Sequence, residues 1–239
     1  MIYPAFLLAV IVSAGLATAA FLPGKGNSPG VLRRERVFAW LANPAVHPEW
    51  AAPLGLRCGN APFVLPTGGL IGFLWGDSFR IGHRHQGIDI FGGTPVGRSA
   101  VVAAYPGYLT RLPEWKSSLI IRVPDDPLKP GRQIWVYYTH MADSQGNSYI
   151  SEQYPPGTEE VYVPAGTLLG YQGNYSGDPD NPVGVHLHFS IVKDNGNNGA
   201  MNEFKLRNTL DPSPYLGIEL NAWRNKGELP GCLPGPSSG

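Results

Sequence analysis

The chain has 239 residues, of which 43% are hydrophobic and 15% are charged, and it contains 31 glycines and 24 prolines. This length allows one substantial core with short extensions rather than two full domains. The many glycines and prolines favour turns and strands over long helices. Eighteen basic and eighteen acidic residues give a net charge of +0, which argues against a nucleic-acid partner because binding to phosphates needs a basic surface.

Residues 1–22 are predicted to be a signal peptide or a membrane anchor. No residue from Ile2 to Leu22 is charged, and the run closes on Ala17-Thr18-Ala19, a pattern suited to cleavage. The same run is nearly long enough to stay in a bilayer as an anchor. The basic residues that follow it would then favour a cytoplasmic domain. We favour export, which would make the protein secreted, periplasmic or attached to the cell envelope.

Residues 23–64 are predicted to form a linker and one short helix. Apolar residues between Val31 and Leu41 have the spacing of an amphipathic helix, and Asn43-Pro44 would end it. The chain has two cysteines, Cys58 and Cys232. An even pair in an exported chain favours a disulfide, with two unpaired thiols as the alternative.

From about residue 68 the sequence changes to short apolar runs that are rich in β-branched and aromatic residues and separated by turn residues. This pattern predicts a mainly β fold, an antiparallel sandwich or open barrel. Residues 217–239 are predicted to be a C-terminal tail, with a short helix before it near Pro214. The expected strands are Ile88–Phe91, Ala100–Ala104, Gly107–Leu112, Ser118–Val123, Gln133–His140, Glu160–Val163, Thr167–Gln172 and Val185–Val192.

Histidines that lie in or next to three of these strands suggest a metal site. In an extended strand His186 and His188 share one face, and so do His85 and Asp89. Catalytic zinc sites usually have three nitrogen or oxygen ligands and keep a fourth position for water. His85 and Asp89 with one of the two later histidines would complete such a set. The alternative to a metal site is that His186 and His188 are two half-exposed surface histidines. His140, taken alone, would more often be a core or edge residue of a strand than a functional one.

The chain resembles the lysostaphin-type zinc endopeptidases, which cut peptide bridges in bacterial peptidoglycan. The resemblance covers roughly Leu65 to Leu216 and implies a zinc endopeptidase domain over 65–216. The fold that it implies is the family's duplicated hybrid motif, a β-rich core with a groove over one sheet. The segments that carry it are, in order, Leu65-Pro-Thr-Gly-Gly-Leu-Ile-Gly72, His85-Gln-Gly-Ile-Asp89, Gly93-Thr-Pro-Val-Gly97, Ala103-Ala-Tyr-Pro-Gly107, Tyr138-Thr-His140, Val163-Pro-Ala-Gly-Thr-Leu-Leu-Gly170, Gly173-Asn-Tyr-Ser-Gly177 and Gly184-Val-His-Leu-His-Phe189.

The resemblance also implies a role for each site residue. His85, Asp89 and His188 match the ligands of one zinc ion per chain, and His140 and His186 match the catalytic pair. One histidine of the pair would move the proton of the attacking water and the other would stabilise the oxyanion. The implied substrates are cross-links or stem peptides of peptidoglycan. The alternative is a non-catalytic module of the same fold that binds the cell wall or activates a hydrolase, but such modules lose site residues and this chain keeps all five.

Three features depart from the family pattern. His83 lies two residues before His85 and could compete as a ligand, although a place in the groove wall is the better expectation. The segments after His140 and after Tyr175 are long and would border the groove, which affects substrate preference.

Some members are kept latent by an upstream asparagine in the open zinc position, and the candidates here are Asn27, Asn43 and Asn60.

Overall fold

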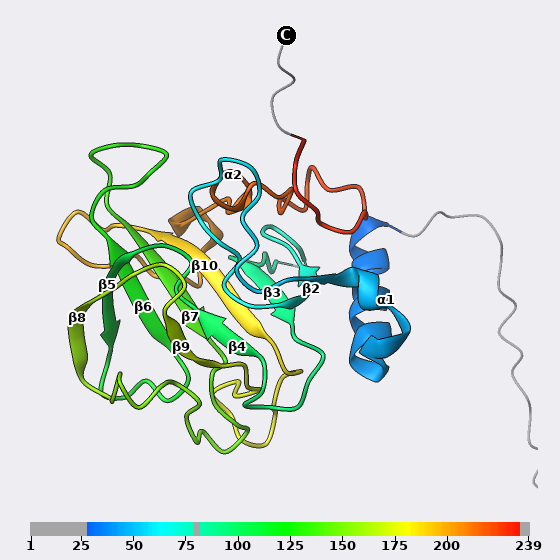
Figure 1. Cartoon of the computed structure of the whole chain (residues 1–239), viewed down its shortest axis with the longest axis horizontal. Helices are drawn as coiled ribbons and strands as arrows, with labels where there is room; N and C mark the ends of the chain where they lie inside the picture. Colours follow the sequence, from blue (N-terminus) through cyan, green and yellow to red (C-terminus); the bar gives the residue numbers. More distant parts are fainter. Residues whose placement is uncertain (1–27, 79–81, 235–239) are drawn as a thin grey trace, which may run out of the picture.

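The computed structural model describes residues 28–78 and 82–234. Within these residues the chain forms two antiparallel sheets, so the prediction of a mainly β fold is confirmed. The larger sheet has the order β1-β2-β3-β10-β7-β6-β5-β8, with β11 also paired to β10, and β4 pairs with β9 in the smaller sheet (Figure 1). The strands are β1 (Ala51–Ala52), β2 (Gly69–Phe73), β3 (Ile88–Phe91), β4 (Ala100–Val102), β5 (Gly107–Arg111), β6 (Leu119–Val123), β7 (Ile134–Thr139), β8 (Thr158–Val163), β9 (Leu168–Tyr171), β10 (Leu187–Lys193) and β11 (Thr209–Leu210).

The eight predicted strands correspond to β3 through β10, and each boundary agrees within two residues. Strands β1, β2 and β11 were not predicted. Two of them have only two residues, and β2 reads Gly-Leu-Ile-Gly-Phe, in which glycine hides the strand pattern. The helices are α1 (Pro29–Ala42) and α2 (Ser213–Leu216), with 3-10 turns at Pro44–Val46, Pro48–Trp50 and Leu206–Asn208.

Side chains alternate along the central strands and give the large sheet two different faces. In β10, Leu187, Phe189 and Ile191 belong to the main hydrophobic core, which also includes Val101 of β4 and Leu169 of β9. Because neighbouring residues point to opposite faces of a sheet, His188 lies on the other face, together with the residue that pairs with it in β3, Asp89. The site therefore forms on the face of the large sheet that is turned away from the main core.

Helix α1 packs on this second face, at the end of the sheet next to β2 (Figure 1). Its buried Val37 and Trp40 form a small apolar cluster with Leu70 and Phe91, and the indole Nε1–H of Trp40 donates to the Phe91 carbonyl over 2.8 Å. Gly72 allows this approach, because a Cβ atom there would lie 2.4 Å from Val37 Cγ2. The helix is thus fixed to the same sheet surface that carries the site.

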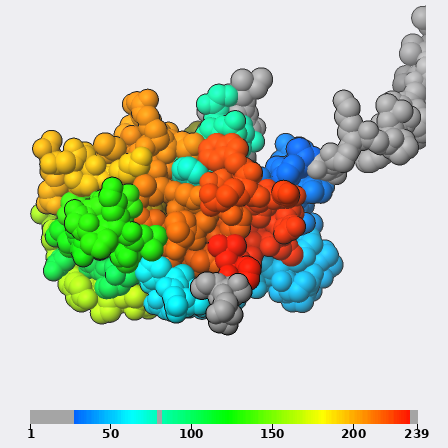
Figure 2. All heavy atoms as spheres, turned by 90° about the horizontal axis from the view of Figure 1, so that it is seen from above, coloured from blue at the N-terminus to red at the C-terminus, as the bar shows by residue number. Residues whose placement is uncertain are grey.

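The segment after β10 returns along the molecule to α1, and Figure 2 shows it in orange and red beside the blue helix. Its Ile218 and Leu220 are buried in the main core. A disulfide joins Cys58 to Cys232, with 5.2 Å between their Cα atoms, so the predicted pairing is confirmed. Within the described residues no helix is long and apolar enough to cross a membrane. Residues 2–22, for which an anchor or signal was predicted, lie outside the described residues.

Replacing both cysteines by serine is expected to lower the free energy of unfolding by about 5 kcal/mol, because the disulfide closes a long loop and restricts the unfolded chain. The bonded residues are 174 positions apart in the sequence. Urea unfolding of the oxidised protein, the reduced protein and the double variant would measure the effect. Reduced protein should match the variant, and equal midpoints for all three samples would contradict the prediction.

Candidate metal centre and groove

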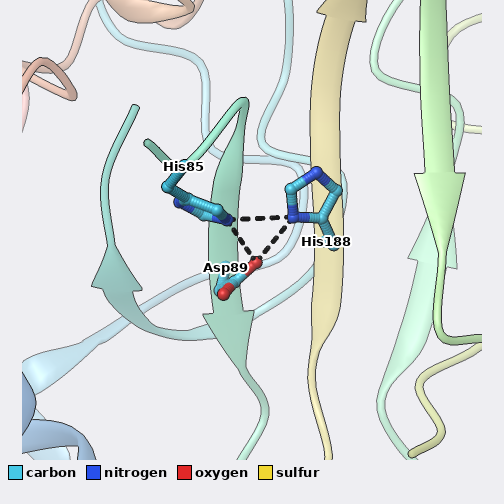
Figure 3. A group of neighbouring side chains, drawn as sticks. All are labelled: His85, Asp89 and His188. Atoms are coloured by element: carbon cyan, nitrogen blue, oxygen red, sulfur yellow. Dashed lines mark hydrogen bonds and ion pairs between the residues drawn. The ribbon is translucent and has the colours of Figure 1, made fainter. Parts of the chain in front are cut away.

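Three side chains, two from neighbouring strands and one from the segment before β3, converge on one point (Figure 3). Asp89 lies in β3, His188 is its pairing partner in β10, and His85 lies on the segment that enters β3. Asp89 Oδ1 is 2.8 Å from His188 Nδ1 and 3.1 Å from His85 Nε2, and the two nitrogens are 3.0 Å apart. All three residues are buried, and they form the group of metal-ligand type found among the described residues.

The hydrogen bonds around the triangle fix where each imidazole keeps its proton. His85 Nδ1 is 3.0 Å from the Leu74 carbonyl oxygen, and His188 Nε2 is 2.9 Å from Glu203 Oε1. A carbonyl or carboxylate oxygen can only accept, so each of these nitrogens donates its N–H outward. The lone pairs of His85 Nε2 and His188 Nδ1 then face Asp89 Oδ1. Three acceptors at this separation require a positive charge between them, and the donor set of two imidazoles and a carboxylate fits zinc.

The pKa values of His188 and Asp89 also indicate that this site favours a positive charge. Burial disfavours the charged form of His188, but its hydrogen bonds to Asp89 and Glu203 outweigh burial and raise its pKa to about 10. Burial alone would raise the pKa of Asp89, yet the surrounding histidines hold it well below its usual range. Both shifts favour positive charge between Asp89 and His188, which a bound cation would supply.

His140 and His186 lie beside the triangle and share one arrangement. The His140 Nδ1–H donates to the Tyr175 carbonyl and the His186 Nδ1–H to the Gly184 carbonyl, each over 2.6 Å. Their ring centroids are 4.5 Å apart, and His186 Nε2 is 3.6 Å from Asp89 Oδ1. Burial lowers the pKa of both rings, that of His140 to about 3. Each ring is therefore a neutral imidazole whose Nε2 holds the lone pair.

The backbone of His140 has a left-handed conformation, with φ of 69°. This conformation ends β7, and it is uncommon for a residue other than glycine. It occurs where the chain turns out of the sheet and His140 reaches His186, which lies just before β10. The five residues that the sequence singled out are thus brought together at adjoining ends of three neighbouring strands.

The site opens into a groove of about 1020 Å³. Aromatic and aliphatic side chains form much of its walls, and the five site residues also line it. The groove is also lined by His83, which the sequence placed there, and this histidine is not in the metal-type group. The apolar wall residues are Val37, Phe38, Leu41, Phe73, Phe91, Trp115, Tyr137, Tyr175, Val183 and Phe204.

Gly87, in the middle of the His85-Gln-Gly-Ile-Asp89 motif, is required by the packing of the backbone. In the structure a Cβ atom on Gly87 would lie 2.2 Å from the Phe189 carbonyl oxygen. Glycine is needed because the chain entering β3 passes directly against β10.

His47 and two of the three asparagines considered for latency do not line the groove. His47 stacks on Trp50 with ring centroids 3.7 Å apart. The Asn43 side chain accepts from the Ala45 backbone N–H, and neither Asn43 nor Asn60 lines the groove. Asn27 lies outside the described residues. Glu203 was missed, because it lies in a loop after β10 with no motif around it.

Neither a protein-family model nor a curated protein matches the chain. Among solved structures, it is similar to the catalytic domain of the antimicrobial peptidase lysostaphin from Staphylococcus simulans, with 18% identity over 66% of this chain and 92% of that domain and a TM-score of 0.38. It is also similar to the catalytic domain of a prophage-encoded M23 protein from Enterococcus faecalis, with 22% identity over 63% of this chain and 96% of that one and a TM-score of 0.38.

Replacing Glu203 by alanine is expected to weaken zinc binding about 10- to 100-fold, because His188 loses the acceptor that fixes its tautomer and ring orientation. Competition with a zinc-sensitive dye would measure the dissociation constant. Glu114→Ala is the matched control, since Glu114 is exposed at the groove wall. Wild-type affinity in Glu203→Ala would show that this contact does not orient the ligand.

Proposed function

We propose that this chain is a zinc-dependent endopeptidase of the lysostaphin type that hydrolyses peptide cross-links or stem peptides of bacterial peptidoglycan. The observation that carries the proposal is the buried triangle of His85, Asp89 and His188. Each of its imidazoles donates its one N–H to an outer acceptor and presents a lone pair inward. The five-residue resemblance in the sequence supports the same assignment.

Zinc held by these three residues would lower the pKa of a coordinated water molecule and polarise the carbonyl of the scissile peptide. His140 and His186 would handle the protons. Each ring is held by a backbone carbonyl through Nδ1, so Nε2 is the nitrogen that accepts a proton from water. The ring that has accepted it becomes a donor and returns the proton to the leaving amine. The resemblance implies that the other ring stabilises the oxyanion, and for this role its Nε2 must carry a proton, because only an N–H can donate to an oxyanion.

The lining of the groove supports a peptide as the substrate. Its walls come from segments far apart in the sequence, among them Phe38 and Leu41 of α1 and, from later segments, Trp115 and Tyr175. Pockets with apolar walls and a few polar groups at the floor bind ligands and orient them through those polar groups. A peptide lying along the groove would place one carbonyl over the metal and the two catalytic histidines.

The disulfide supports an exported protein. Structural disulfides persist in oxidising compartments and are rare in the cytosol of most organisms, and here Cys58 and Cys232 are bonded. We therefore assign the protein to the cell envelope or the exterior, where peptidoglycan is the available substrate. Residues 2–22 would act as the export signal or as an anchor.

Digestion of purified peptidoglycan, with the released peptides identified by mass spectrometry, tests the proposal. The full chain should release peptides, a chelator should stop the release, and added zinc should restore it. His140→Ala is expected to lose at least about 100-fold in rate because it lacks a proton-transfer group, while still binding one zinc ion. His47→Ala is the matched control and should cut like wild type, because His47 stacks on Trp50 and does not line the groove.

A folded, zinc-loaded wild-type protein that binds peptidoglycan but cuts none of its chemical types would contradict the enzymatic proposal. That result would favour the non-catalytic module that binds the wall or activates another hydrolase. His140→Ala with wild-type activity would instead remove His140 from the catalytic pair and leave the metal site unaffected.

A further inference from the structure

Helix α1 buries an arginine against an aspartate that lies shortly before His85 in the sequence. Arg33 is 4% exposed and Asp77 is 6% exposed. The guanidinium binds both carboxylate oxygens, with Nε 2.9 Å from Oδ2 and Nη2 in an ion pair with Oδ1. Its Nη1 also donates to Asn225 of the C-terminal segment. Arg33 thus joins three parts of the chain at one point.

Asp77 in turn organises the backbone that holds His85. Its Oδ2 accepts the Leu74 N–H over 2.8 Å, and its backbone carbonyl accepts the His85 N–H over 2.8 Å. Gly76 N–H donates to the His85 carbonyl over 2.8 Å. The Leu74 carbonyl is the group that accepts from His85 Nδ1. Both the main chain of His85 and the acceptor that sets its tautomer are therefore held by the turn at 74–77.

This turn has little freedom to adjust by itself. Gly76 has φ of 86°, a conformation that favours glycine, and a Cβ atom there would lie 2.6 Å from the ring of Trp223. Trp75 N–H donates to the Leu220 carbonyl, and Ala222 N–H donates to the Trp75 carbonyl. The C-terminal segment thus supports one side of the turn, and Arg33 supports its carboxylate.

We propose that Arg33 is a positioning residue for the metal centre: through Asp77 and the 74–77 turn it holds His85 Nε2 in place as a ligand. The inference rests on the metal site proposed above and extends the functional unit upstream to helix α1. The adjoining face of the same helix supports this extension, since Arg34, Phe38 and Leu41 line the groove. The helix would position a metal ligand through Arg33 and would also form part of the groove wall that contacts the substrate.

Zinc affinity of the purified full chain tests the inference without relying on catalysis. Arg33→Met keeps a long apolar stem and removes the ion pair, and we expect its zinc dissociation constant to rise about tenfold, at the lower end of what outer contacts of metal ligands contribute. Arg36→Met is the matched control, because Arg36 lies one turn further along α1 and donates to the Gly227 carbonyl instead. Its zinc affinity should equal that of wild type.

The variant Arg33→Met leaves the Asp77 carboxylate buried without its cation, so it can unfold for that reason alone. Arg33→Met combined with Asp77→Asn removes both charges and keeps an oxygen that can accept from Leu74. Circular dichroism would verify folding of each sample. The same weakening of zinc binding in a folded variant supports the inference, and wild-type affinity in a folded Arg33→Met or in the folded double variant overturns it.

The absorption spectrum of the cobalt-substituted protein separates positioning from a general loss of stability. A displaced His85 would change the ligand field of cobalt in Arg33→Met, whereas a merely destabilised protein would keep the wild-type spectrum in its folded fraction. Wild type that binds no stoichiometric metal would instead refute the metal site itself. The two failures are therefore distinguishable.

Discussion

The register of β10 between its two neighbours is the constraint on which the site depends. His188 lies opposite Asp89 of β3 and opposite Thr139 of β7. A shift by one residue would turn His188 into the core and bring Leu187 and Phe189 out of it. Burial of each such apolar side chain contributes about 1.5–3 kcal/mol, so the packing of the core enforces the register. The same packing places the ligands side by side.

The groups at the site do not stabilise the fold in the way the core does. Asp89 and the histidines around it are buried polar groups, and taking such groups out of water costs free energy that their mutual contacts offset. A buried ion pair such as Arg33–Asp77 is also weak evidence for net stability, because desolvation offsets its attraction. We infer that the ion pair serves to fix the position of the 74–77 turn, which holds His85.

Strands and ligand candidates could be predicted from the sequence because both follow short periodic patterns. Alternation along β10 placed His186 and His188 on one face, and the His85-to-Asp89 motif pointed to a second strand. Glu203 and Arg33 could not be predicted, because their roles come from contacts between distant segments. Arg33 is one of the basic residues that follow the apolar N-terminus, and nothing in their pattern indicates that the structure buries it against Asp77. The reason for Gly87 also needed the structure, since it depends on the approach of β10.

Metal analysis of the purified full chain combined with X-ray absorption at the zinc edge tests the central claim most directly. The account predicts one zinc ion per chain, with nitrogen and oxygen ligands at about 2.0–2.1 Å, an outer-shell signature of imidazole and no sulfur ligand. His188→Ala should lose this zinc while its disulfide remains intact. A folded wild-type protein without stoichiometric metal, or zinc retained in His188→Ala with an unchanged spectrum, would contradict the account.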